Sequence, residues 1–245
     1  MSETTRHCSV GIVVALALEA KALTTNTVYP ERFTPLANGA SLWLSGMGPT
    51  AARIAAQGLA DKGATALATF GVAGALQAGL RCGTLFCPAR VLDDNGHGYT
   101  PEPAWRTSLL QRLEATGLSV LDAGDLISMP IPLLTTAAKI AAHDRYAAAA
   151  VDMESAAVAA VAKDRNLPFL ALRAIVDEVD DTVPAELHES VDAWGRPRPL
   201  KLIIAFSRHP SLLTYLPTLH SRMQRATRAL HAAGNAAGPM LSWRP

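Results

Sequence analysis

Short apolar runs rich in Val, Ile, Leu and Ala alternate with helical stretches, and each run ends at a glycine, a proline or an acidic residue. The clearest runs are Val10–Leu16, Ser41–Leu44, Ala64–Phe70, Ala147–Val151 and Pro168–Val176. Because consecutive positions are apolar, both faces of each strand must be covered, as in a mostly parallel sheet between helices. The alternation therefore predicts an α/β fold with three layers, α/β/α, around a mostly parallel, mixed central sheet.

The remaining segments extend this alternation. Further strands are expected at Gly83–Val91 and Gly117–Asp122, and helices are expected at Ala17–Leu23, Thr50–Lys62, Pro103–Thr116, Pro132–His143 and Glu154–Arg165. After residue 183 the composition changes, because Pro184–Pro199 is polar and rich in proline and is typical of a long loop. Helices are expected beyond it at Leu200–Arg208 and Leu212–Leu230. We predict one domain, in which residues 1–183 form the α/β unit and residues 184–245 form a Pro-rich loop and a C-terminal helical appendage of the same domain.

Composition excludes several classes of function. With 22 Lys and Arg against 21 Asp and Glu, and 5% aromatic residues, the chain has no global basic field and few stacking platforms for nucleic acid. The apolar run Val10–Leu18 is about half the length that spans a bilayer, and it lacks the cleavage pattern of a secretory signal. Cys8, Cys82 and Cys87 fit no disulfide framework, and the seven histidines form no metal motif. We expect a cytoplasmic protein without a metal.

Acidic residues and glycines follow the predicted strands at the point where each strand ends. They are Glu19, Gly46–Gly48, Gly71–Gly74, Asp152–Glu154 and Asp177. Ligands of open α/β sheets collect at the carboxyl ends of the strands, so these groups are candidates for one site. Each has a structural alternative: a first-turn acid for Glu19, tight turns for the glycines, a helix N-cap for Asp152. Glu154 fits a structural role least, because it starts a helix face that is otherwise Ala and Val.

The motifs at these positions resemble those of the nucleoside phosphorylase/nucleosidase superfamily, over about Val10 to Asp181. The resemblance lies in Ser45-Gly-Met-Gly, Phe70-Gly-Val-Ala-Gly, Val151-Asp-Met-Glu-Ser and Leu172-Arg-Ala-Ile-Val-Asp, in the same order and with similar spacing. Within the superfamily the chain looks most like the hopanoid-associated phosphorylases. That likeness rests on Ala150-Val-Asp-Met-Glu-Ser, on Asn166-Leu-Pro-Phe-Leu-Ala-Leu-Arg and on the tail after Asp177.

The resemblance implies cleavage of the N-glycosidic bond of a purine nucleoside and assigns roles to matching residues. Asp177 matches the general acid that faces the purine, and Glu19 matches the carboxylate that activates water. Glu154 matches the carboxylate that binds both ribose hydroxyls, and Met153 the residue packed on the sugar. The other matching positions are Gly46 and Met47 on the opposite side of the sugar, and Val72, Ala73 and Gly74 beside the base and the nucleophile.

Two departures from the family pattern leave the function open between three hypotheses. Val72 and Val176 stand where many relatives have a hydroxyl side chain. The leading hypothesis is release of adenine from a 5'-substituted adenosine, adenosylhopane, in hopanoid side-chain biosynthesis. The alternatives are a nucleosidase of the 5'-methylthioadenosine/S-adenosylhomocysteine type or a small-nucleoside phosphorylase, and a catalytically silent nucleoside-binding protein.

The nucleophile also stays open between water and inorganic phosphate, which would be a co-substrate; no other cofactor is expected. Arg53, in the first turns of the helix after Gly46–Gly48, is the candidate contact for a phosphate anion. Glu19 argues for water, because an ionised carboxylate repels phosphate.

The C-terminal helix carries an apolar stripe formed by Leu212, Leu216, Leu219, Met223, Ala226 and Leu230, with Arg222, Arg225 and Arg228 between them. Such a stripe packs on its own domain or on a second subunit, or it rests on the anionic inner face of a membrane. The family resemblance further implies a homo-oligomer. Both the peripheral membrane contact and the oligomer are expectations.

Overall fold

The computed structural model describes residues 10–244, and within them eleven strands form one sheet. The strands are β1 (Val10–Val14), β2 (Phe33–Pro35), β3 (Ser41–Leu44), β4 (Ala66–Ala75), β5 (Leu85–Phe86), β6 (Arg90–Leu92), β7 (Gly98–Tyr99), β8 (Val120–Leu121), β9 (Asp125–Ser128), β10 (Ala150–Asp152) and β11 (Phe169–Asp177). The helices are α1 (Ala17–Ala20), α2 (Pro49–Asp61), α3 (Pro103–Glu114), α4 (Thr136–Tyr146), α5 (Ser155–Asp164), α6 (Ala185–His188), α7 (Pro199–Arg208) and α8 (Leu216–Ala237), with short 3₁₀ helices η1 (Ala37–Gly39) and η2 (Pro210–Tyr215).

Strand β4 is the centre of the sheet and pairs with three other strands. Its first half lies parallel to β1, its length lies parallel to β11, and its end pairs antiparallel with β10. From β1 the sheet continues to β3 and β2, and from β10 it continues to β9, β6 and β7. The main pairs β1–β3, β9–β10 and β6–β9 are parallel, while the edge strands β2 and β7 run antiparallel. The predicted mostly parallel, mixed sheet is therefore confirmed.

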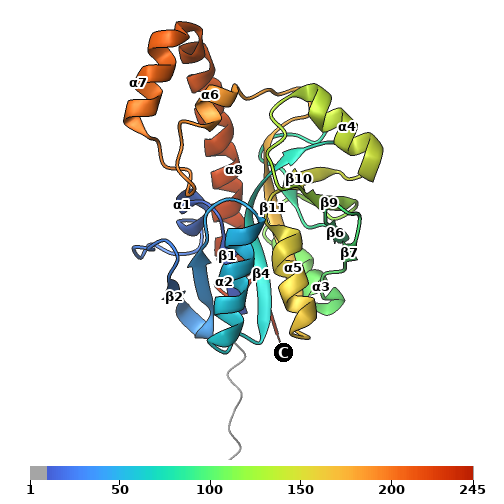
Figure 1. Cartoon of the computed structure of the whole chain (residues 1–245). Helices are drawn as coiled ribbons and strands as arrows, with labels where there is room; N and C mark the ends of the chain where they lie inside the picture. Colours follow the sequence, from blue (N-terminus) through green and yellow to red (C-terminus); the bar gives the residue numbers. More distant parts are fainter. Residues whose placement is uncertain (1–9, 245) are drawn as a thin grey trace, which may run out of the picture.

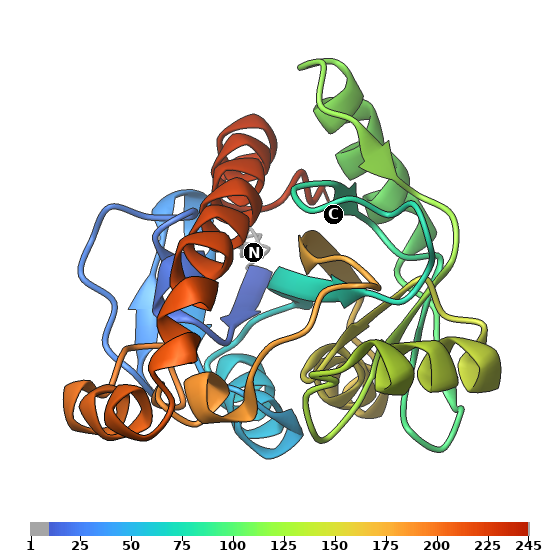
Figure 2. The same cartoon turned by 90° about the horizontal axis from the view of Figure 1, so that it is seen from above.

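Helices cover both faces of this sheet (Figures 1 and 2). Helices α2 and α5 pack on one face, where small side chains such as Ala52, Ala56 and Ala159 allow close approach. Helices α3 and α8 pack on the other face, where Trp105 and Leu230 are buried. Both faces of the sheet are therefore shielded from solvent, which explains why the strands are apolar at consecutive positions. The three-layer α/β/α prediction is confirmed.

Several predicted boundaries of strands and helices differ from the structure, at points where the sequence pattern gives no clear sign that an element begins or ends. The predicted strand Gly83–Val91 is two strands, β5 and β6, separated by Pro88, which cannot donate to a ladder. Strand β9 was not predicted. Helix α4 begins at Thr136, four residues later than expected, because the side chain of Thr135 accepts a hydrogen bond from the Ala138 N–H and caps it.

The segment after residue 183 packs on the α/β unit that precedes it. Within the predicted loop, α6 forms a single helical turn, and α7 and η2 follow as a helical hairpin. Helix α8 starts at Leu216, with Pro217 in its first turn, and its residues Ala226, Leu230 and Ala233 lie in the core beneath the sheet. Over this stretch the predicted apolar stripe contacts its own domain. Among residues 10–244, no helix combines the length and hydropathy that a membrane-spanning helix needs.

Candidate active site

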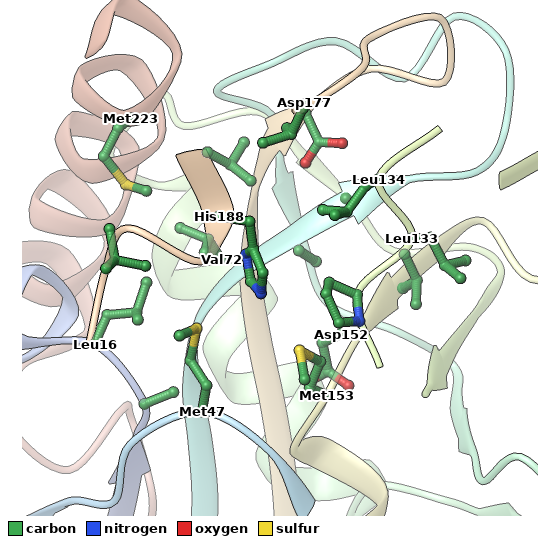
Figure 3. Close-up of a pocket in the computed structure, with 18 of the residues that line it drawn as sticks. Leu16, Met47, Val72, Leu133, Leu134, Asp152, Met153, Asp177, His188 and Met223 are labelled. Carbon is green, nitrogen blue, oxygen red and sulfur yellow. The ribbon is translucent and has the colours of Figure 1, made fainter. Parts of the chain in front are cut away.

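A cavity of about 350 Å³ opens at the carboxyl ends of β1, β4, β10 and β11 (Figure 3). We call it the strand-end cavity. Eight of the ten site residues predicted from the sequence line it: Glu19, Met47, Val72, Ala73, Gly74, Met153, Glu154 and Asp177. In Figure 3, Asp177 lies at the opposite end of the cavity from Met47 and Met153. The acids at three separate strand ends thus face one space.

The structure does not bring Gly46 and Arg53 to the cavity. Gly46 faces Trp194 and Ala193, which lie behind the loop whose next residue, Met47, does reach the cavity. Arg53 is exposed on α2 and is not among the residues that line the cavity. Arg53 is therefore not placed to contact an anion in the strand-end cavity, and the predicted phosphate contact stays a prediction without support from this geometry.

Glu19 is fixed by three backbone N–H groups. Its Oε2 atom accepts hydrogen bonds from the N–H groups of Ala15 at 2.9 Å and Leu16 at 2.8 Å, and its Oε1 atom accepts one from Val72 at 2.8 Å. Burial raises the pKa of Glu19, while the nearby Arg173 and these hydrogen bonds lower it in part. Glu19 thus caps the start of α1 and at the same time lines the cavity.

Glu154 lies between the starts of two helices. It precedes α5, and its Oε1 atom accepts a hydrogen bond of 2.7 Å from the N–H of Gly48, the residue that caps α2. Gly48 has a φ of 100°, a conformation that favours glycine. Burial and the neighbouring charge of Asp152 raise the pKa of Glu154 to about 7, against the lowering effect of Arg173. This carboxyl group changes its protonation near neutral pH.

Beneath these two acids lies a buried ion pair that the sequence analysis did not assign. The Nη2 atom of Arg173 is 2.5 Å from Oδ2 of Asp152, and it donates to the hydroxyls of Ser155 at 2.8 Å and Thr69 at 3.2 Å. Asp152 also accepts a hydrogen bond of 2.5 Å from Ser128. The available signal was that Arg173 is the one charged residue inside an otherwise apolar strand. Its cation offsets the concentration of carboxylates above it.

Gly71 makes this arrangement sterically possible. A Cβ atom at Gly71 would lie 2.6 Å from Nη1 of Arg173 and would also overlap the carboxylate of Glu19. Both charged side chains therefore pass directly over the backbone of β4. The glycine is a close-approach residue inside a strand, where the sequence suggested a turn after one.

Asp177 is held by a lysine from a distant helix. Lys139 on α4 is buried, forms an ion pair with Oδ2 of Asp177, and donates to the backbone carbonyls of Glu178 at 2.7 Å and Asp181 at 3.0 Å. Burial raises the pKa of Asp177, and the Lys139 cation opposes that rise. Lys139 therefore orients the carboxylate that Val176 cannot orient through a hydroxyl. No sequence signal singled it out, because a lysine in an Ala-rich helix is ordinarily exposed.

The remaining lining of the strand-end cavity is mostly apolar and comes mostly from segments far along the chain. Met223 on α8 and His188 on α6 both line the cavity (Figure 3). Arg222 lines the cavity with them and forms an ion pair with Asp181. The apolar residues of this wall are Leu16, Ile131, Pro132, Leu133, Leu134, Val183, Leu187, Val191, Leu219 and Met223. Carboxylates thus lie at the strand ends, and the apolar residues, which we call the apolar wall, surround the cavity from both sides, with Leu16 on one side and Leu133 and Leu134 on the other in Figure 3.

Among residues 10–244, no group of three or more His, Cys, Asp or Glu side chains is placed to hold a metal ion. Cys87 is buried beside β5, and burial raises the pKa of its thiol to about 12. Cys8 lies outside the described residues.

Several solved structures share this fold at low sequence identity. A 5'-methylthioadenosine/S-adenosylhomocysteine nucleosidase from Helicobacter pylori is 14% identical, with a TM-score of 0.68 over 96% of this chain and 97% of that one. A futalosine hydrolase from the same organism is 15% identical, with a TM-score of 0.66 over 94% and 98%. The corresponding nucleosidase from Neisseria meningitidis is 18% identical, with a TM-score of 0.66 over 92% and 98%. At these identities the similarity establishes the fold alone.

A sequence-family comparison goes further than the fold. No curated protein matches the sequence with significance. The family model of the phosphorylase superfamily, however, matches residues 9–208, which is most of the chain and includes every strand-end acid of the cavity. The chain therefore belongs to the phosphorylase superfamily, whose nucleoside phosphorylases and nucleosidases cleave the N-glycosidic bond of nucleosides.

Proposed function

We propose that this enzyme releases adenine from a 5'-substituted adenosine whose 5' substituent is apolar. One observation carries the proposal: Glu19, Glu154 and Asp177 line a single cavity whose remaining lining is mostly apolar. Three carboxylates at one cavity suit a sugar that becomes positively charged during the reaction, because they stabilise that charge. The apolar wall suits a substituent without charge or hydrogen-bonding groups.

The proposed roles follow from where each carboxylate is held. Glu154 accepts hydrogen bonds from both ribose hydroxyls, in its ionised form. Asp177, protonated, donates to N7 of the purine while the C1'–N9 bond breaks and its electron pair passes to the base. Glu19 takes a proton from the attacking water as the new C1'–O bond forms. These steps require Asp177 to be protonated at the start of each turnover, which the burial of its carboxyl group favours.

We propose water as the nucleophile. In the part of the chain that the structure describes, Arg222 is the one Lys or Arg that lines the strand-end cavity, and its charge is already paired with Asp181. Two like charges 4 Å apart near a protein surface repel by about 4 kcal/mol. A phosphate dianion beside ionised Glu19 would experience this repulsion without a free cation to offset it. Phosphorolysis, which the likeness to hopanoid-associated phosphorylases implies, is the competing outcome.

We propose adenosylhopane as the substrate, because it agrees both with the likeness to hopanoid-associated phosphorylases and with the apolar lining of the cavity. Its 5' substituent is a polycyclic hydrocarbon, which would extend from the apolar wall of Leu187, Leu219 and Met223 through the open side of the cavity. The alternative, 5'-methylthioadenosine, has a small apolar substituent and would fill only part of that wall. S-adenosylhomocysteine has a charged amino-acid group, and that group would meet apolar side chains.

The test is adenine release from adenosylhopane, 5'-methylthioadenosine and S-adenosylhomocysteine, each with and without phosphate. We expect release without phosphate, the largest kcat/KM for adenosylhopane and the smallest for S-adenosylhomocysteine. Strict dependence on phosphate overturns the choice of water. A preference for 5'-methylthioadenosine overturns the choice of substrate. Nucleoside binding without release from any of the three identifies a silent binding protein.

The acid assignment has its own test. We expect Asp177→Asn to reduce kcat by at least about 10²-fold, the lower range for loss of a general acid, because the amide cannot protonate N7. Asp180→Asn, three residues along the same loop and exposed, is the matched control and should keep the wild-type rate. Equal rates for wild type and Asp177→Asn reject the assignment.

A further inference from the structure

Helix α7 is apolar on both of its faces, although only one face is covered. Leu202, Ala205 and Phe206 point inward and pack with Leu187 and Leu212. The opposite face carries Leu200, Ile203 and Ile204, with exposed fractions of 72%, 64% and 42%. A helix on the surface of a domain normally has polar residues on its outer face, so these three residues need an apolar neighbour that the described chain does not supply.

The segment that follows α7 repeats this feature. In η2 and the first residue of α8, Leu212 is buried, whereas Leu213, Tyr215 and Leu216 are exposed. Residues 199–216, which we call the α7–η2 hairpin, thus carry six of the twelve large exposed apolar side chains of the described chain. Such a concentration within a short segment indicates an interaction surface and not scattered surface residues. In Figure 1 the hairpin projects beyond the sheet at the same end as α6.

The charge around the hairpin has one sign. Residues 193–245 contain eight Lys and Arg and no Asp or Glu, whereas residues 1–192 contain 14 Lys and Arg and 21 Asp and Glu. Arg196, Arg198, Lys201 and Arg208 are all exposed, and within the described residues none of them forms an ion pair. The local surface is therefore both apolar and cationic, on a molecule whose remainder is acidic.

We propose that the α7–η2 hairpin docks the protein on an anionic lipid bilayer. Apolar side chains enter the interface between headgroups and acyl chains, while Lys and Arg side chains contact the anionic headgroups. A second copy of the chain is a poorer occupant, because a symmetric contact would place these cations against the same cations of the other copy. This surface shares Leu212 and Leu216 with the apolar stripe predicted from the sequence, but the stripe continues along α8 to Ala226 and Leu230, which are buried.

The hairpin is also connected to the strand-end cavity. Leu187 on α6 packs against Ala205 and Leu212 of the hairpin on one side and lines the cavity on the other. A hairpin bound to lipid would thus hold the apolar wall of the cavity next to the bilayer. Docking itself does not depend on the proposed reaction, and its test measures binding alone.

The experiment is flotation of the full chain with vesicles of phosphatidylcholine, alone or mixed with phosphatidylglycerol. We expect recovery with the mixed vesicles to exceed recovery with phosphatidylcholine alone by about 10-fold at low salt, and to fall as salt screens the headgroups. Leu200→Ser combined with Ile203→Ser, and separately Lys201→Glu, should each lower recovery with the mixed vesicles at least about 3-fold.

Ile54→Ser is the matched control, because Ile54 is 58% exposed on α2, away from the hairpin. It should float like the wild type. Equal recovery of the Leu200/Ile203 variant and the wild type overturns the proposal, as does the absence of binding to any vesicle. Size-exclusion chromatography of the same variants tests the other occupant: a dimer that dissociates in the Leu200/Ile203 variant, without vesicle binding, would show that the hairpin is a subunit interface.

Discussion

Each acid of the strand-end cavity is held by a different kind of partner. Glu19 accepts backbone N–H groups, Glu154 accepts the N–H at the start of α2, and Asp177 pairs with the Lys139 cation. Burial raises the pKa of all three, and in each case the partner opposes that rise. The three carboxyl groups thus share the cause that raises their pKa and differ in the partner that opposes the rise.

At this scale Lys139 is expected to set the pH dependence of the acid. Lys139→Met removes the cation that lowers the pKa of Asp177, so Asp177 stays protonated to higher pH. The alkaline limb of kcat/KM should move upward by about one pH unit or more. The measurement is the pH profile of adenine release, with the exposed Lys21→Met as control. A variant that loses thermal stability while its alkaline limb stays in place would show that Lys139 is only structural.

Glu154 is expected to limit stability at alkaline pH. Its pKa is about 7 in the folded chain and near 4.5 when exposed, so the folded state favours the neutral carboxyl. The associated stability is present below pH 4.5 and is lost as pH rises through about 7. Glu154→Gln cannot ionise and should be more stable than the wild type at pH 8.5, by up to about 3 kcal/mol, and nearly equal at pH 4.5.

Urea denaturation of both proteins at the two pH values measures this difference. If Glu154→Gln is the less stable protein at pH 8.5, the interpretation of the buried carboxyl is wrong. The same variant should lose most of its activity, because an amide oxygen cannot accept both ribose hydroxyls as a carboxylate does.

The sequence predicted the acids of the cavity but not their cationic partners, and the reason is physical. Glu19, Glu154 and Asp177 each follow a strand, and parallel strands bring their carboxyl ends to one edge. Lys139 and Asp177 are 38 residues apart on elements that meet only after α4 has docked. Gly46 was predicted for the sugar side, but its loop turns so that Met47 and the N–H of Gly48 reach the cavity instead.

Among the elements, segments with a clear apolar or amphipathic pattern were predicted well, and segments without one were not. Strand β3 matches its predicted range, and helix α7 begins one residue before its own predicted start. Strand β9 has four residues and lies between segments without periodicity, so pairing with β6 and β10 decides its conformation, not its own composition.

Helix α8 is expected to contribute to the stability of the whole fold through its buried half. Leu230→Ala should lower the free energy of unfolding by about 2–5 kcal/mol, because Leu230 is fully buried beneath the sheet. Leu213→Ala, at a half-exposed position of the α7–η2 hairpin, is the control and should change it by less than about 0.5 kcal/mol. Chemical denaturation measures both. Similar values for the two variants would contradict the placement of α8 in the core.

For the molecule as a whole, the chain supplies its own apolar wall beside the catalytic acids. The family match ends at residue 208, yet Leu219, Arg222 and Met223 line the strand-end cavity. The family resemblance implies a homo-oligomer, in which a neighbouring subunit completes the 5' pocket. In this structure α6 and α8 line the cavity from within one chain, while the oligomer stays a prediction.

This wall is expected to recognise the substituent. In a series of 5'-alkylthioadenosines, KM should fall with each added methylene by up to about 4-fold until the wall is covered, since a buried methylene contributes about 0.8 kcal/mol. Met223→Ser should weaken this dependence and leave the KM of adenosine itself nearly unchanged. Steady-state kinetics of adenine release measures both. A KM that is independent of chain length would contradict an apolar 5' site.

Strand β4 continues through Gly71–Gly74, and three of these residues, Val72, Ala73 and Gly74, belong both to the central ladder and to the lining of the cavity. Side chains alternate between the two faces of a strand, and a single-residue insertion there would turn every later side chain to the wrong face. Changes in chain length are therefore compatible with this sheet in its loops, among which residues 131–134 and the segment after residue 183 line the cavity. Divergent substrate preferences among related proteins should map to these two segments.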